Sequence, residues 1–210
     1  MTNFPNKLKY NSLEFFNDYL KKLNNVYQKI DKKKLIDASN LITLKIKKNR
    51  NLFVCGNGGS SAIASHFVCD YMKQLNKYTK LRANVSNLLS ETTLVSAIAN
   101  DISYDEIFRF QLKSKMKKGD LLICISSSGN SKNIINAVKY SKTLKNKIIG
   151  FTNFDGGYLR NNSDILIHSK IKNYGIGEDI NHILMHAIMQ HITLKNLKLK
   201  KKKNYFIKLN

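Results

Sequence analysis

The chain has 210 residues, of which 42% are hydrophobic and 10% aromatic, enough for one folded domain with a full core. No apolar run reaches the length of a membrane span, and the residues after Met1 lack the hydrophobic centre of a secretory signal, so we expect a cytoplasmic protein without membrane insertion. The formal net charge is +22, but the lysines are dispersed along the chain, which argues against a nucleic-acid partner.

Two amphipathic helices are predicted near the start of the chain. Apolar residues recur at helical spacing from about Ser12 to Lys48, and the apolar face changes near Ile30 and Asp31. We therefore expect two helices that meet at this point and form an N-terminal helical segment within residues 1–48.

Short apolar runs then alternate with amphipathic stretches. The candidate strands are Leu52–Cys55, Asn84–Leu88, Leu121–Ile125, Lys147–Phe151 and Ile165–His168. The candidate helices are Ser60–Gln74, Thr92–Ala99, Tyr104–Met116, Ser131–Leu144 and Glu178–Leu197. Strands separated by helix-length segments predict βαβ units, and hence an α/β fold with a central five-stranded parallel sheet. We expect one domain over residues 1–197, followed by a basic tail at 198–210.

Two loops rich in glycine and serine follow predicted strands. The first is Gly56-Asn-Gly-Gly-Ser-Ser61, and the second runs from Ser126 to Ser131 around Gly129. Backbone N–H groups and hydroxyls at the start of a helix, where the helix dipole is positive, favour binding of a phosphate group. The first loop has neither the Gly-Lys-Ser/Thr ending of a nucleotide-phosphate loop nor the glycine spacing of a dinucleotide fingerprint, so we expect no nucleotide cofactor.

Histidines and carboxylates on two predicted helices could form a divalent metal site. His66 and Asp70 are four residues apart and share a helix face, and Glu178 and His186 are eight residues apart on the last helix. Imidazole and carboxylate ligands together are typical of zinc, although a pair at this spacing also occurs on solvated helix surfaces. His182 and His191 are interpreted as surface or packing residues, and the role of His168, at the end of a strand, stays open.

The order of these motifs resembles the sugar isomerase (SIS) fold, and within it the phosphoheptose isomerase family. The resemblance is carried by Gly56-Asn-Gly-Gly-Ser60, His66, Ser96-Ala-Ile-Ala-Asn-Asp101, Ser126-x-Ser-Gly-Asn-Ser131, Asp155-Gly-Gly and Glu178 with His186. It implies three-layer α/β/α subunits in a homotetramer with sites at subunit interfaces. It also implies conversion of D-sedoheptulose 7-phosphate to D-glycero-D-manno-heptose 7-phosphate, for heptose of capsule or lipopolysaccharide.

The resemblance also implies roles for individual residues. The substrate-binding residues would be Asn57, Gly58, Gly59, Ser60, Asn100, Asp101, Ser126, Ser127, Ser128 and Ser131. The catalytic residues would be Asp70, Glu178 and His186. One zinc ion per site would be held by His66, Asp70, Glu178 and His186.

The chain departs from the family pattern at two of these positions. Asp70 stands where the family commonly has Glu, and Glu178 stands where it commonly has Gln. Both exchanges keep oxygen ligands, and the second adds a negative charge that favours a cation. They leave open which carboxylate is the base and which sugar phosphate is the substrate. The alternatives are another sugar-phosphate isomerase of this fold and a non-catalytic module that binds a sugar phosphate.

Overall fold

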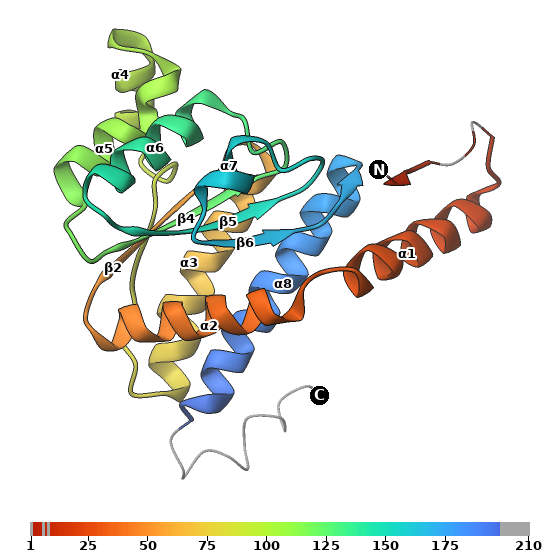
Figure 1. Cartoon of the computed structure of the whole chain (residues 1–210), viewed down its shortest axis with the longest axis horizontal. Helices are drawn as coiled ribbons and strands as arrows, with labels where there is room; N and C mark the ends of the chain where they lie inside the picture. Colours follow the sequence, from red (N-terminus) through yellow and green to blue (C-terminus); the bar gives the residue numbers. More distant parts are fainter. Residues whose placement is uncertain (1, 6, 8, 198–210) are drawn as a thin grey trace.

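The computed structural model describes residues 2–5, 7 and 9–197, and the predicted basic tail at 198–210 lies outside them. The chain forms a central sheet with helices on both faces, and one N-terminal helix projects from this body (Figure 1). Among the described residues, no helix combines the length and the apolar character needed to cross a bilayer.

The two N-terminal helices are present as predicted. Helix α1 spans Ser12–Gln28 and α2 spans Lys32–Lys47. Each begins at a polar residue that accepts a backbone hydrogen bond: the Asn11 side chain accepts from the N–H of Glu14, and the Asp31 side chain from that of Lys33. The cap at Asp31 explains why the helical pattern is interrupted where the apolar face changes.

The main sheet has five parallel strands in the order β3-β2-β4-β5-β6, which confirms the predicted architecture. The strands are β2 (Asn51–Cys55), β3 (Asn84–Asn87), β4 (Leu121–Ser126), β5 (Lys147–Thr152) and β6 (Ile165–His168). A separate two-stranded pair, β1 (Thr2–Asn3) with β7 (Ile171–Lys172), was not predicted, because two-residue strands carry no periodicity.

Helices cover the sheet in two layers. On one face lie α2, α3 (Gly59–Tyr78) and α8 (Tyr174–Lys195). On the other lie α4 (Thr92–Asp101), the 3₁₀ turn η1 (Tyr104–Glu106), α5 (Ile107–Lys115), α6 (Lys132–Thr143) and α7 (Gly157–Asn162). The short helix α7 was not predicted, since six residues do not complete two helical turns.

Two apolar cores, one on each face, explain the continuous hydrophobic runs of the strands. In β2, Leu52 and Val54 belong to the core under α3 and α8, whereas Phe53 and Cys55 belong to the core under α5 and α6. Successive side chains of a strand point to opposite faces, so a strand covered on both sides needs apolar residues at every position.

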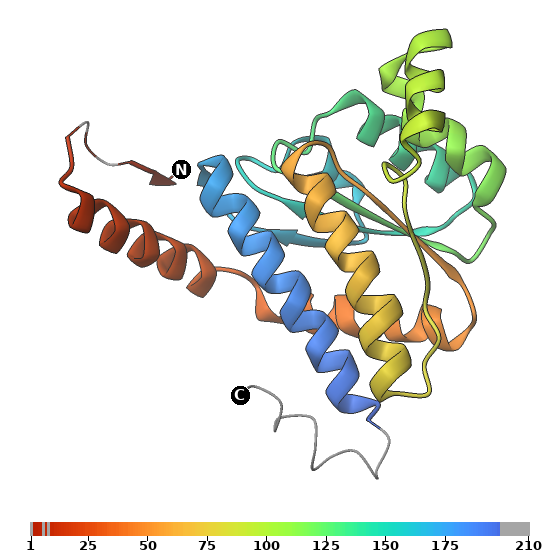
Figure 2. The same ribbon diagram turned by 180° about the vertical axis from the view of Figure 1, so that it is seen from behind.

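Two features of this architecture position the site. The strands are parallel, so the loops after β2, β4 and β5 meet at one edge of the sheet. Helices α3 and α8 lie side by side and run in the same direction from that edge, as Figure 2 shows. Residues at corresponding depths of the two helices therefore face each other.

Candidate active site

The glycine-rich loop after β2 leads directly into α3. Gly58 is the N-cap, with φ 52° and ψ −125°, and as a glycine it has no side chain that could cap this helix end. The N-terminus of a twenty-residue helix thus keeps N–H groups available beside Ser60, and the helix dipole adds positive potential. This local structure suits an anion.

The serine turn, residues 126–131, follows β4 and leads into α6. Ser126 Oγ accepts the N–H of Gly129 and Ser128 Oγ accepts the N–H of Asn130, each at 3.2 Å. Two further hydroxyls do not serve the turn. Ser131 is the N-cap of α6 but makes no side-chain cap bond, and Ser127 Oγ is buried without a hydrogen-bond partner among the described residues. The turn therefore retains hydroxyls that a ligand can use.

The loop after β5 and the start of α7 contact the serine turn and hydrogen-bond to it. Gly129 has φ 68°, and a Cβ added there would lie 2.1 Å from the carbonyl oxygen of Gly156. The N–H of Tyr158, in α7, donates to Asn130 Oδ1 at 2.7 Å, and the N–H of Leu159 donates to the Gly129 carbonyl at 3.2 Å. The close backbone contact explains the glycine in the serine turn.

The two loops share one cavity of about 300 Å³ at the carboxyl edge of the sheet. It is lined by the predicted binding residues Asn57, Gly58, Gly59, Ser60, Ser126, Ser127, Ser128 and Ser131, and also by Ile125, Tyr174 and Glu178. Asn57 is held from both sides, because its side chain exchanges hydrogen bonds with Asn133 at 3.0 Å and accepts one from Tyr104 at 3.1 Å. The cavity thus brings together most of the predicted substrate-binding residues.

Asn100 and Asp101 are the predicted binding residues that this cavity does not include. Both lie at the end of α4, and Asn100 Nδ2 donates to Asp101 Oδ1 at 2.8 Å. Within one chain, these side chains contact each other and do not line the cavity of the two loops.

His66, Asp70 and His186 converge between α3 and α8. The Nε2 atoms of the two histidines are 3.2 Å apart. Asp70 is buried, and its two carboxylate oxygens lie 3.6 Å from His66 Nε2 and 3.4 Å from His186 Nε2. Both imidazole side chains remain partly exposed, at 43% and 35%, so the group opens to solvent.

His182 joins this group, although its sequence context indicated a surface or packing residue. Its Nε2 lies 2.9 Å from His66 Nδ1, and the three histidines form one cluster that could hold a metal ion. Burial and the charges of His186 and His66 lower the pKa of His182, which favours the neutral imidazole. The available signal was its position four residues before His186, on the same helix face. His191, by contrast, packs as expected and contacts Ser39 Oγ at 2.8 Å.

Glu178 lies at the cavity of the glycine and serine loops. It lines the loop cavity, and a Cβ on Gly59 would meet its Oε2. Burial, with a contribution from Asp179, raises the pKa of the Glu178 carboxyl. Eight residues of helix separate Glu178 from His186, about 12 Å along the axis. The site thus has two parts at different depths along α3 and α8.

The donor atoms fit a divalent transition metal. Two imidazole nitrogens and one carboxylate group lie 3.2, 3.4 and 3.6 Å from one another. Ligands at about 2.0–2.1 Å around a tetrahedral zinc ion are separated by about 3.3 Å. Histidine and carboxylate are also the ligand types that zinc accepts.

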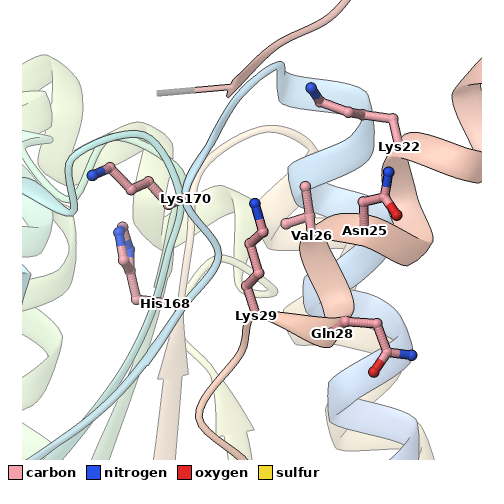
Figure 3. A pocket seen from close by; sticks show the side chains of 7 residues that line it. All are labelled: Lys22, Asn25, Val26, Gln28, Lys29, His168 and Lys170. Atoms are coloured by element: carbon pink, nitrogen blue, oxygen red, sulfur yellow. The ribbon is translucent and has the colours of Figure 1, made fainter.

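A second cavity, of about 690 Å³, lies between α1 and the end of β6. Figure 3 shows residues of its lining, with Lys22 of α1 and Lys29, the residue after α1, on one side and His168 and Lys170 on the other. His168 contacts Thr152 Oγ1 at 3.0 Å, and burial lowers its pKa. None of the predicted binding or catalytic residues lines this cavity.

Comparison with known proteins agrees with the fold. The family model of the SIS domain matches residues 14–153, which is more than half of the chain, so the chain belongs to the SIS domain family.

Its relatives narrow this assignment to the phosphoheptose isomerases. A phosphoheptose isomerase of Buchnera aphidicola is 34% identical over 194 residues, covering 90% of this chain and 95% of the relative. A probable phosphoheptose isomerase of Thermoplasma acidophilum is 35% identical over 162 residues, covering 77% and 88%. Among solved structures, a phosphoheptose isomerase from Neisseria gonorrhoeae has a TM-score of 0.77 at 28% identity and covers 84% of this chain and 94% of its own.

Proposed function

We propose that this protein is an aldose–ketose isomerase that converts D-sedoheptulose 7-phosphate to D-glycero-D-manno-heptose 7-phosphate. Membership in the phosphoheptose isomerase family supports the reaction class. The observation that carries the proposal is the convergence of His66, Asp70 and His186 on the same helix pair that starts at the serine-lined cavity.

The loop cavity binds the phosphate group of the substrate. The start of α3 supplies N–H groups and positive potential, and the serine turn supplies the unused hydroxyls of Ser127 and Ser131. Holding the phosphate orients the sugar, which lowers the entropic part of the barrier.

The reacting carbons lie at the other end of the seven-carbon chain from the phosphate. Glu178 is at the phosphate end, whereas Asp70 adjoins His186 about two helix turns further along. We therefore assign Asp70 as the base that removes the proton from C1, while the oxygen at C2 takes a proton from solvent and an enediol forms. His186 then delivers a proton to C2 as the oxygen at C1 releases its proton to solvent, which completes the aldose. Transfer of a proton from Asp70 to His186, 3.4 Å away, restores both groups.

A zinc ion fits His66, Asp70 and His186, and when bound it polarises the carbonyl and hydroxyl oxygens of the substrate. Glu178, predicted as a further ligand and as an alternative base, is assigned to the sugar hydroxyls near the phosphate, because its carboxylate lies against Gly59. D70N and E178Q variants separate these roles. If Asp70 is the base and Glu178 binds hydroxyls, D70N lowers kcat strongly and E178Q mainly raises KM.

We further propose that the protein assembles as a homotetramer with sites at subunit interfaces. Leu13, Phe16 and Leu20 form an apolar row on α1, and their exposed fractions are 71%, 64% and 64%. Such a row on a projecting helix is suited to packing against a second copy. A neighbouring subunit would also bring Asn100 and Asp101 to a cavity that they do not line within their own chain.

We place the enzyme in the cytoplasm and its product in the synthesis of heptose for capsule or lipopolysaccharide. Cys55 and Cys124 are buried neighbours on β2 and β4, with Sγ atoms 3.6 Å apart as free thiols. Unpaired cysteines in a core are typical of a reducing compartment.

The test is a product assay with sedoheptulose 7-phosphate. Appearance of an aldoheptose phosphate supports the proposal, and an H186A variant should lower turnover by roughly two to four decades. H191Q is the matched control, because His191 is on the same helix but contacts Ser39 instead of the site. Turnover of a hexulose phosphate alone would favour another isomerase of this fold. Binding without turnover of any ketose phosphate would favour a sugar-phosphate sensor.

A further inference from the structure

His182 lies next to the proposed metal site, and neither the reaction nor the predicted ligand set gives it a role. It is on α8, one turn before His186, and its ring packs against the ring of His66 with centroids 4.8 Å apart at 75°. Its Nε2 is 2.9 Å from His66 Nδ1, within normal hydrogen-bond range.

The two nitrogens of His66 face different partners. Nε2 faces His186 Nε2 at 3.2 Å and Asp70 at 3.6 Å, whereas Nδ1 faces His182. An imidazole that binds a metal through one nitrogen carries its proton on the other, and that N–H normally donates to a nearby acceptor. If Nε2 is the ligand atom, the proton of His66 lies on Nδ1 and points at His182.

We propose that His182 is a positioning residue for the metal ligand His66, accepting a hydrogen bond from His66 Nδ1–H through its own Nε2. This inference rests on the metal site of the proposed function. The bond holds the His66 ring in the orientation that aims Nε2 at His186 and Asp70. It also selects the tautomer of His66 in which Nε2 has a free lone pair.

The contrasting arrangement makes His182 a direct third imidazole ligand. All three histidines offer a nitrogen within 4.8 Å of the others, so the cluster itself permits this arrangement. The contact at 2.9 Å decides between the two, because it reaches the nitrogen of His66 that faces away from His186 and Asp70.

The experiment measures zinc affinity of the full chain in the absence of substrate, by competition with a chromophoric chelator. Removing a hydrogen-bond partner of a metal-bound histidine typically weakens metal binding by about 10–100-fold, and we expect this loss for H182A. H182Q keeps an acceptor oxygen near the position of Nε2 and should recover most of the affinity. H191Q should bind zinc as the unchanged protein does. Circular dichroism of the metal-free variants verifies that each one is folded.

Metal K-edge X-ray absorption then counts the imidazole ligands. We expect the same number in the unchanged protein and in H182A, because His182 lies outside the coordination sphere. Loss of one imidazole in H182A, or equal zinc affinity of H182A and the unchanged protein, overturns the proposal, as does an H182Q variant as weak as H182A.

The zinc-binding results can be interpreted independently of the product assay for isomerase activity. A protein that follows the expected affinity pattern but does not convert sedoheptulose 7-phosphate retains His182 as a positioning residue and refutes only the reaction. A protein that isomerises the sugar but binds no zinc refutes the positioning role.

Discussion

Replacing Gly129 by alanine tests whether the interlocked loops build the phosphate cavity. Gly129 has φ 68°, where an L residue costs about 1–2 kcal/mol. The new Cβ would lie 2.1 Å from the Gly156 carbonyl oxygen, and displacing that backbone adds an overpacking cost of about 1–3 kcal/mol. The sum, about 2–5 kcal/mol, corresponds to a fall in Tm of about 4–20 °C for a chain of this size.

The displacement also reaches the site. The N–H of Gly129 bonds to Ser126 Oγ, and its carbonyl accepts from Leu159, so moving this residue separates the serine turn from α7. We therefore expect G129A to raise KM for the phosphorylated sugar, in addition to lowering Tm. Thermal melting followed by circular dichroism and initial-rate kinetics on the same preparation measure both effects.

The matched control is G119A. Gly119 also has a positive φ, 99°, but its added Cβ would meet only the flexible side chain of Arg50, at 3.1 Å, in the turn before β4. We expect a smaller loss of Tm there and an unchanged KM. If G129A has the Tm of G119A and an unchanged KM, the loops do not depend on the close contact between Gly129 and Gly156. The prediction for G129A is then refuted.

Three further predictions concern the site and the assembly. S127A removes a buried hydroxyl that has no hydrogen-bond partner among the described residues. We expect KM for the sugar phosphate to rise about 10-fold, equivalent to about 1.4 kcal/mol of binding free energy, while Tm stays constant. An unchanged KM would exclude this hydroxyl from phosphate binding. F16D places a charge in the exposed apolar row of α1, so sedimentation velocity should show a smaller assembly than for the unchanged protein. K21E, a charge exchange elsewhere on α1, is the control and should leave the assembly unchanged. Removing metal with a chelator should abolish turnover and zinc should restore it; full turnover by protein shown to be metal-free would contradict the proposed site.

The sequence was sufficient for the fold because its signals are local. The strand Leu121–Ser126 is buried at every position, and its apolar run indicates cover on both faces, while the helices between strands show their own periodicity. Helix α7 and the strand pair β1–β7 were not predicted, because each is too short to show a hydrophobic periodicity in the sequence.

In the site, too, the features that depend on neighbouring residues were predicted, and those that depend on helix packing were not. The glycine and serine loops were identified because each is a continuous segment whose residue types favour anion binding. The spacing of His66 and Asp70 indicated a shared helix face, but no spacing within either helix states which residues of α3 meet which residues of α8.

The chain by itself therefore determined a five-stranded parallel sheet and the glycine- and serine-rich loops that follow its strands, since these depend on residues close together in sequence. Only the packing of α3 beside α8 decided that His182 contacts His66 and that Glu178 lines the cavity of the glycine and serine loops. The physical reason is that the axial offset of two packed helices is set by the core between them, and a difference of one turn changes which imidazoles and carboxylates face each other.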